Sequence, residues 1–182
     1  MEFMTGKKEK EVLDLTAVFA DGMEGREVKV NGAIMSVRNM GDIAFVILRK
    51  RDGVLQTVYE KGMTDADFTE LREETFVEVS GVLRKEERAP RGMELRLKSV
   101  RILSKPEEPM PIAVSKWKMS ASLEAKLDMR SLTLRNLRER ARFRIQEGIA
   151  RAFREYLHGE GFTEIHSPKI GAKGAEGGAN VF

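Results

Sequence analysis

The first part of the chain falls into short segments with a strand-like spacing of apolar side chains. Residues 28–30 alternate between apolar and polar, and the phase changes at residues 32–33, which predicts a first strand curved by a bulge there. Residues 43–49 are apolar on both faces, so their spacing does not show which face meets the core. The Asp-Gly pair at residues 52–53 predicts a tight turn into a third strand over residues 54–59. We therefore expect a meander of three strands.

A helix and two further strands are predicted next. Residues 64–72 favour a helix, because Thr64 suits an N-cap and apolar residues follow at helical spacing. Residues 76–83 and 93–98 alternate or are largely apolar, which is typical of strands. The order strand, strand, strand, helix, strand, strand is that of an OB-fold. In this Greek-key barrel the second and third strands usually carry the face that binds oligonucleotides.

Proline changes the pattern after the fifth predicted strand. Three of the chain's five prolines lie within residues 105–111, where neither a strand nor a helix continues easily, so we place a domain boundary there. The pattern stays weak in the residues that follow, and Trp117 is expected to anchor this hinge against a neighbouring element. The sequence thus predicts an N-terminal extension over residues 1–25, a barrel over residues 26–104 and a hinge over residues 105–134.

A long helix is predicted from Arg135 onward, at the start of a second domain over residues 135–182. Apolar residues recur along it at helical spacing, namely Ala141, Ile145, Ile149, Ala152, Phe153 and Tyr156. Glycines then end the helix, residues 162–165 predict a short strand, and Pro168 stops that strand. The apolar helix face is expected to be buried, either in a core of the same chain or against another copy.

Composition narrows the classes of function. There is no cysteine and there are two histidines, so neither a disulfide framework nor an all-protein metal cage is expected. No apolar stretch approaches the roughly 20 residues of a membrane span, and residues 1–10 lack the apolar run of a signal peptide, so we expect a cytoplasmic protein without membrane contact. Arginines gather at residues 130–154, and a basic loop covers residues 84–91. Each could contact phosphates or form an ordinary solvated surface.

Three residues on the predicted strands could contact a nucleic-acid base. Phe45 on the second strand could stack on a base for about 1–3 kcal/mol, although a phenylalanine between two apolar neighbours could equally belong to the core. Gln56 on the third strand could pair with a base edge or be an ordinary exposed amide. Glu94 on the fifth strand could accept a hydrogen bond from an exocyclic amine or pair with basic residues beside it.

The most specific strings lie near the end of the chain. Gly-Phe-Thr-Glu-Ile-His-Ser-Pro-Lys-Ile occupies residues 161–170, and Glu-Gly-Gly-Ala-Asn-Val-Phe occupies residues 176–182. With the arginine-rich helix before them, these strings resemble motif 1 and the following flexible loop of class II aspartyl-tRNA synthetases of the archaeal and eukaryotic type. The resemblance implies an α+β chain with an N-terminal five-stranded OB-fold β-barrel, a hinge, and the first helix and strand of a class II catalytic domain. The strand order described above agrees with it.

The resemblance assigns roles to the three candidate residues of the barrel. Phe45 falls on the family's aromatic residue that stacks on the anticodon. Gln56 and Glu94 fall on its base-reading glutamine and glutamate. The anticodon loop of tRNA is therefore the expected partner of the barrel.

Motif 1 implies a homodimer in this family. Pro168 matches the motif 1 proline, and Ile145, Ile149 and Phe153 would then be buried across a two-fold axis. An intramolecular core helix remains the alternative explanation of this apolar face.

The loop after motif 1 is expected to contact the amino-acid substrate. Glu176 matches the carboxylate that approaches the ammonium group of bound aspartate, and Gly177 and Gly178 would let the loop close over it. Without the resemblance, this segment is a glycine turn with an acidic residue. Ala175 stands where some members have serine, so a hydroxyl contact is not carried over.

A complete member of the family is an ATP-dependent aspartate–tRNA ligase. It would hold ATP through arginines of motifs 2 and 3, and Mg²⁺ through particular acidic residues of the catalytic domain. Neither these motifs nor those acidic residues are found in this sequence. We therefore expect a fragment that carries tRNA binding and motif 1, contains no catalytic residue or metal ligand, and is inactive alone. Residues from Phe162 onward are expected to be poorly ordered, because a strand without neighbours leaves backbone groups unpaired.

Two other functions fit the same residues. An asparaginyl-tRNA synthetase shares the barrel and motif 1, and a stand-alone tRNA-binding OB module would share the barrel without catalysis. The sequence does not decide between aspartyl and asparaginyl specificity, or whether one tRNA or two would be charged.

Overall fold

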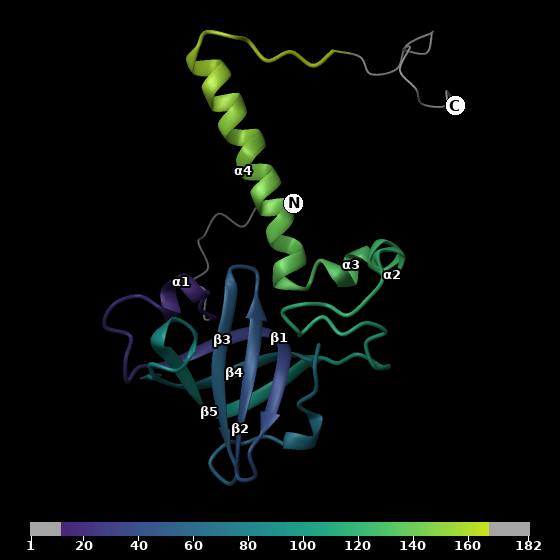
Figure 1. Ribbon diagram of the computed structural model, residues 1–182. Helices are drawn as coiled ribbons and strands as arrows, with labels where there is room; N and C mark the ends of the chain where they lie inside the picture. Colours follow the sequence, from purple (N-terminus) through teal and green to yellow (C-terminus); the bar gives the residue numbers. More distant parts are fainter. Residues whose placement is uncertain (1–11, 168–182) are drawn as a thin grey trace, which may run out of the picture. The chain divides into compact units, whose positions relative to one another are not determined.

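A closed β-barrel forms the first of two compact units in the computed structural model, which describes residues 12–167. The first unit ends at Asn136 and the second begins at Leu137. The strand order is β1-β2-β3-β5-β4, with β3 parallel to β5 and all other neighbours antiparallel (Figure 1). The strands are β1 (Glu27–Asn39), β2 (Ile43–Lys50), β3 (Gly53–Glu60), β4 (Phe76–Lys85) and β5 (Met93–Ser104). The predicted five-stranded OB-fold barrel is confirmed.

The helical segments of the first unit are all short. They are α1 (Leu15–Val18), η1 (Phe68–Glu70), η2 (Pro90–Gly92), α2 (Leu123–Asp128) and α3 (Arg130–Thr133). The second unit contains the long helix α4 (Leu137–Gly159), which begins two residues later than the sequence predicts. Across residues 12–167, no helix is both long enough and apolar enough to cross a membrane.

In strand β1 the alternation of buried and outward-facing residues continues from Val28 to Ile34, where the sequence predicts an interruption. Val28, Val30 and Ile34 face the core, and Gly32 takes the buried position between them. A Cβ at Gly32 would lie 3.0 Å from the carbonyl oxygen of Arg49, so the close approach of β2 favours glycine there. The bulge follows at the register shift between Ile34 and Ser36. The predicted position of the bulge is therefore wrong by about two residues, because the glycine hid the alternation.

The structure decides which face of β2 meets the core. Ala44, Val46 and Leu48 are buried, whereas Phe45 is only partly buried on the opposite face. The core of the barrel also contains residues from every other strand, including Val30, Leu55, Leu83 and Leu95. Filling the barrel with these aliphatic side chains leaves the other face of β2 on the outer surface.

The predicted helix over residues 64–72 is wrong. Its place is taken by η1, a single 3₁₀ turn capped by Asp67, whose side chain accepts a hydrogen bond from the backbone N–H of Thr69. Thr64 is buried, and its hydroxyl donates to the carbonyl oxygen of Leu97 and accepts from the N–H of Glu60. These contacts use the hydroxyl to fix the end of β3 against β5, so it does not serve as a helix cap.

The short strand predicted over residues 162–165 is not formed in the described part of the chain. Residues 162–167 carry no helix or strand, and the N–H of Phe162 donates to the carbonyl oxygen of Leu157 as the chain leaves α4. A strand forms only with a neighbour that satisfies its backbone groups, and the described residues offer none to this segment.

A buried carboxylate, Glu74, joins Arg135, near the end of the first unit, to Arg49 of the barrel. Its side chain is 3% exposed and accepts two hydrogen bonds from Arg49 of β2, at 2.7 and 2.9 Å, and one from Arg135 Nη1 at 2.8 Å. Burial raises the pKa of Glu74, but the hydrogen bonds and charge of Arg49, followed by those of Arg135, outweigh it and hold the pKa below its ordinary value. The carboxylate is therefore a charged link between two parts of this unit.

Replacing Glu74 by glutamine should destabilise the barrel, because Arg49 is nearly buried and would lose its counter-charge. We expect Glu74→Gln to lower the free energy of unfolding by on the order of 3 kcal/mol, measured by chemical denaturation. The control is Glu78→Gln, whose ion pair with Arg101 lies at the exposed surface and should contribute less than about 1 kcal/mol. Equal losses in the two variants would contradict this assignment.

The same carboxylate should make stability depend on acid. Because the pKa of Glu74 is lower in the folded state, its contribution is complete above its ordinary pKa of 4.5 and is lost as the pH falls through the lower folded value. Wild type should therefore lose more stability than Glu74→Gln between about pH 5 and pH 3. Parallel pH profiles would show that Glu74 is not the group responsible.

Candidate nucleic-acid interface

The outer face of the barrel brings four strands together in two adjacent rows of side chains. Residues in register across β1, β2, β3 and β5 form the first row: Ser36, Ile47, Gln56 and Glu94. The second row lies two residues along each strand: Arg38, Phe45, Val58 and Arg96. Because side chains alternate between the faces of a sheet, both rows share one surface.

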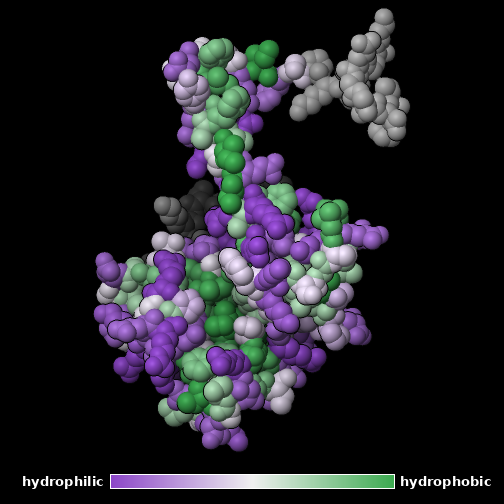
Figure 2. Space-filling model, in the orientation of Figure 1, coloured by the Kyte–Doolittle hydropathy of each residue, from purple (hydrophilic) through white to green (hydrophobic). Residues whose placement is uncertain are grey.

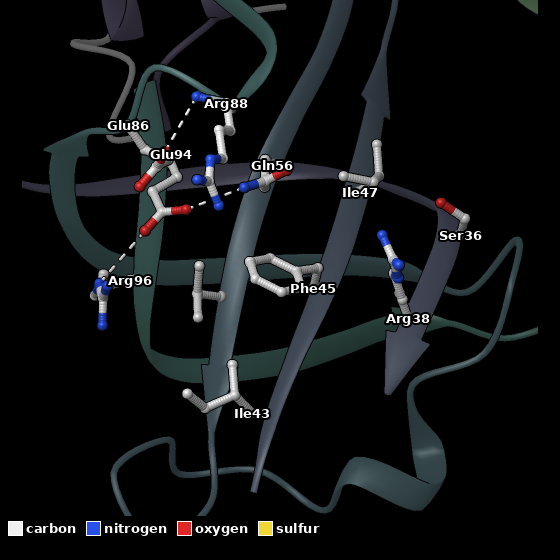
Figure 3. Close-up of a pocket in the computed structure, with 11 residues that line it drawn as sticks. Ser36, Arg38, Ile43, Phe45, Ile47, Gln56, Glu86, Arg88, Glu94 and Arg96 are labelled. Atoms are coloured by element: carbon white, nitrogen blue, oxygen red, sulfur yellow. Dashed lines mark hydrogen bonds and ion pairs between the residues drawn. The ribbon is translucent and has the colours of Figure 1, made fainter. Parts of the chain in front are cut away.

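A shallow hollow of about 540 Å³ covers these rows. Ile43 of β2 extends its floor, and Glu86 and Arg88 from the β4–β5 connection border it (Figure 3). Figure 2 shows a strip of hydrophobic side chains over the middle of the barrel with hydrophilic side chains on both sides. An apolar floor with polar edges suits a flat, partly polar ligand such as a nucleobase.

Phe45 lies at the centre of the side chains that line the hollow (Figure 3). Its position follows from the alternation of β2, which places Ala44 and Val46 in the core on either side of it. Val58 lies beside it on β3, on the same face of the sheet, and is 2% exposed. A partly exposed aromatic ring on a rigid strand can stack on a base of any sequence.

Glu94 and Gln56 form a hydrogen-bonded pair beside the ring. Gln56 Nε2 donates to Glu94 Oε2 at 3.0 Å, and Arg96 Nε lies 3.5 Å from Glu94 Oε1. The carboxylate belongs to a residue that is 3% exposed, so these partners offset the cost of its burial. With its amide nitrogen directed to Glu94, the oxygen of Gln56 remains available as an acceptor for a base edge.

The arginines at the edge of the hollow differ in their pairing. Arg96 is held by Glu60 of β3 as well as by Glu94. Within residues 12–167, neither the Arg38 nor the Arg88 guanidinium is paired with a carboxylate. These two cations are therefore free to contact phosphates.

The structure thus brings together Phe45, Gln56 and Glu94, the three barrel residues singled out from the sequence. Arg38 and Arg96 were missed, because their place beside Phe45 depends on strand register. The signal that could have found Arg38 is the pairing of β1 with β2, which sets it opposite Phe45.

A second group of predicted residues lies on α4, in the other unit. Ile145, Ile149 and Phe153 are 64%, 67% and 63% exposed and line a common shallow groove. The intramolecular core that would bury them is therefore not formed by the described residues.

The remaining predicted residues, Pro168, Glu176, Gly177 and Gly178, lie outside the described part of the chain. Within that part, no group of three or more histidine, cysteine or acidic side chains could hold a metal ion.

Two family models match the chain. The model described as an OB-fold nucleic acid binding domain matches residues 28–103, which cover the barrel. The model described as tRNA synthetases class II (D, K and N) matches residues 122–182.

Individual proteins agree with these matches. An aspartate–tRNA(Asp/Asn) ligase of Archaeoglobus fulgidus is 37% identical over 171 residues, which cover 92% of this chain and 40% of that protein. A ligase of the same name from Deinococcus radiodurans is 39% identical over 159 residues, which cover 87% of this chain and 35% of that protein. The crystal structure of asparaginyl-tRNA synthetase from Pyrococcus horikoshii complexed with asparaginyl-adenylate has a TM-score of 0.75 and 28% identity, covering 88% of this chain and 37% of that one. The chain spans 40% or less of the length of each protein.

Proposed function

Because this chain belongs to the class II tRNA synthetases of the D, K and N group, we propose that it is the tRNA-binding part of an aspartate–tRNA ligase. The complete enzyme would use ATP to attach aspartate to tRNA. The observation that carries the proposal is the hollow on the barrel, which gathers Phe45, Gln56 and Glu94 on one face. Relatives named aspartate–tRNA(Asp/Asn) ligase at 37–39% identity support the choice of amino acid.

The hollow would bind the anticodon loop through unstacked bases. One base would stack on the Phe45 ring, which lies beside Val58 of β3 among the residues that line the hollow. Gln56 and Glu94 would form hydrogen bonds with the edge of a base and so favour particular bases. Arg38 and Arg88 would contact the sugar–phosphate backbone and hold the loop in register.

ATP and Mg²⁺ would be the cofactors of the complete enzyme. Among residues 12–167, no group of three or more histidine, cysteine or acidic side chains could hold a metal ion, and the role we propose for these residues is to bind and orient tRNA. We place the protein in the cytoplasm, where tRNA is charged. The loop residues Glu176, Gly177 and Gly178 are proposed to contact aspartate and Pro168 to mark motif 1, both from the resemblance of their strings.

An asparaginyl-tRNA synthetase is the second candidate. The similarity to the Pyrococcus horikoshii enzyme favours it, although the identity of 28% is lower than the 37–39% shared with the aspartate ligases. A non-catalytic tRNA-binding module is a further alternative. Aspartate-dependent exchange of pyrophosphate into ATP by this 182-residue chain would show that it is active alone, contrary to our expectation.

The exposed face of α4 would form a homodimer. Ile145, Ile149 and Phe153 follow one another at helical spacing on this face. A two-fold axis would place the same face of a second copy against them, since isologous contacts use one surface twice. The length of α4, 23 residues, provides a continuous interface for such a contact.

Removing the ring of Phe45 should weaken RNA binding without unfolding the barrel. We expect Phe45→Ala to raise the dissociation constant for an aspartate tRNA anticodon stem-loop by about 5- to 150-fold, the equivalent of one lost stacking contact. Fluorescence anisotropy of labelled RNA measures the affinity, and thermal unfolding checks the fold.

Phe76→Ala is the matched control, because Phe76 is 38% exposed on β4 and lies away from the hollow. It should bind RNA like wild type. If Phe45→Ala unfolds the chain, Phe45 serves the core. If it binds as tightly as Phe76→Ala, the hollow is not the binding site.

A charge on the exposed face of α4 should prevent dimer formation. We expect wild type to sediment as a dimer and Ile149→Asp as a monomer, because an aspartate in an apolar interface loses its hydration. Analytical ultracentrifugation over a range of concentrations measures this. Leu103→Asp, at an exposed position of β5, is the control and should remain dimeric. A monomeric wild type, or a dimeric Ile149→Asp, would contradict the proposed interface.

A further inference from the structure

The hinge displays the only tryptophan of the chain on its surface. Trp117 is 69% exposed, although tryptophan is buried on average in folded proteins. The expectation that it anchors the hinge against a neighbour is therefore wrong. Lys116 and Lys118 on either side of it are also exposed.

Buried residues and hydrogen bonds hold the loop that carries the exposed Trp117 side chain. Val114 and Met119 on either side of the loop are 3% and 5% exposed. Asn136, which is 1% exposed, donates from Nδ2 to the carbonyl oxygens of Val114 at 2.9 Å and Lys116 at 2.7 Å. The backbone before the tryptophan is thus held by Asn136, the chain after it is buried at Met119, and the ring between them is exposed.

The two residues adjacent to Trp117 in the chain are both basic. The nearest acidic residues in the sequence are Glu108 and Glu124, nine and seven positions away. In the described part of the chain, neither lysine forms an ion pair. An exposed ring between two free ammonium groups combines a stacking surface with two phosphate contacts, whereas an apolar protein partner would leave both charges without a counterpart.

We propose that Trp117 is a second RNA-stacking residue, which receives an unpaired nucleotide of the bound tRNA while Lys116 and Lys118 contact the phosphates beside it. The proposal rests on the proposed function, because it concerns the same RNA. It adds a contact outside the hollow of the barrel, since Trp117 does not line that hollow. The tRNA would then be held at two places of the first unit.

Intrinsic fluorescence tests this directly, because every tryptophan photon from the chain comes from Trp117. Titration of the 182-residue chain with an aspartate tRNA transcript should quench the emission and protect the ring from acrylamide. The affinity should fall about 5- to 150-fold in Trp117→Ala and recover most of its value in Trp117→Phe. Replacing both lysines by alanine should reduce the slope of log affinity against log salt by about 2.

The outcomes separate this inference from the proposed function. If anisotropy shows tight tRNA binding that depends on Phe45 but the emission of Trp117 does not change, the second contact is absent and the anticodon site stands. If wild type does not bind tRNA, the proposed function is contradicted, and the inference about Trp117 falls with it. If the free chain already shields Trp117 from acrylamide, the ring packs on protein and the inference is overturned.

Discussion

Closure of the barrel by the parallel pairing of β3 with β5 is the constraint on which the candidate site depends. The residues in register are Gln56 with Glu94, Thr57 with Leu95, and Val58 with Arg96. Strand β5 pairs with β4 as well, and the register of these two strands shifts beside Gly81, where a Cβ would lie 2.0 Å from the carbonyl oxygen of Arg96. A backbone contact this close admits only glycine. Residues 38 positions apart in the chain are thereby brought within one hydrogen bond of each other.

Because successive side chains of a strand point to opposite faces of the sheet, each strand contributes residues both to the core and to the outer surface. Ala44, Val46 and Leu48 must fill the barrel, so Phe45 is left on the outer face between them. A shift of one residue in register would place the ring in the core and an aliphatic side chain in the hollow. The buried carboxylate of Glu94 adds directional polarity to this apolar floor, and its partners hold it in place before any ligand arrives.

Much of the fold could be predicted from the sequence, because the strands have local signals such as the Asp-Gly turn at residues 52–53. Which face of β2 carries Phe45 could not be predicted, because β2 is apolar on both faces. Only closure of the barrel makes one of these faces the inside and the other the outside. The bulge of β1 was misplaced because Gly32 occupies a buried position without a side chain. The helix at residues 64–72 was wrong because Thr64 is used by a contact with a strand more than 30 residues away. The class II synthetase region could be recognised by its residue order, which does not depend on the fold, and a family model matches it over residues 122–182.

The central claim is that bases bind on the outer face of β1, β2, β3 and β5. Mapping of backbone amide chemical shifts on the isotopically labelled chain, during titration with an anticodon stem-loop RNA, tests it most directly. The account predicts that the largest changes lie at residues 36–38, 43–47, 56–58 and 94–96, and that the outer positions of β4 around Glu78 change little. Changes concentrated on β4, or spread without preference over the barrel, would contradict it.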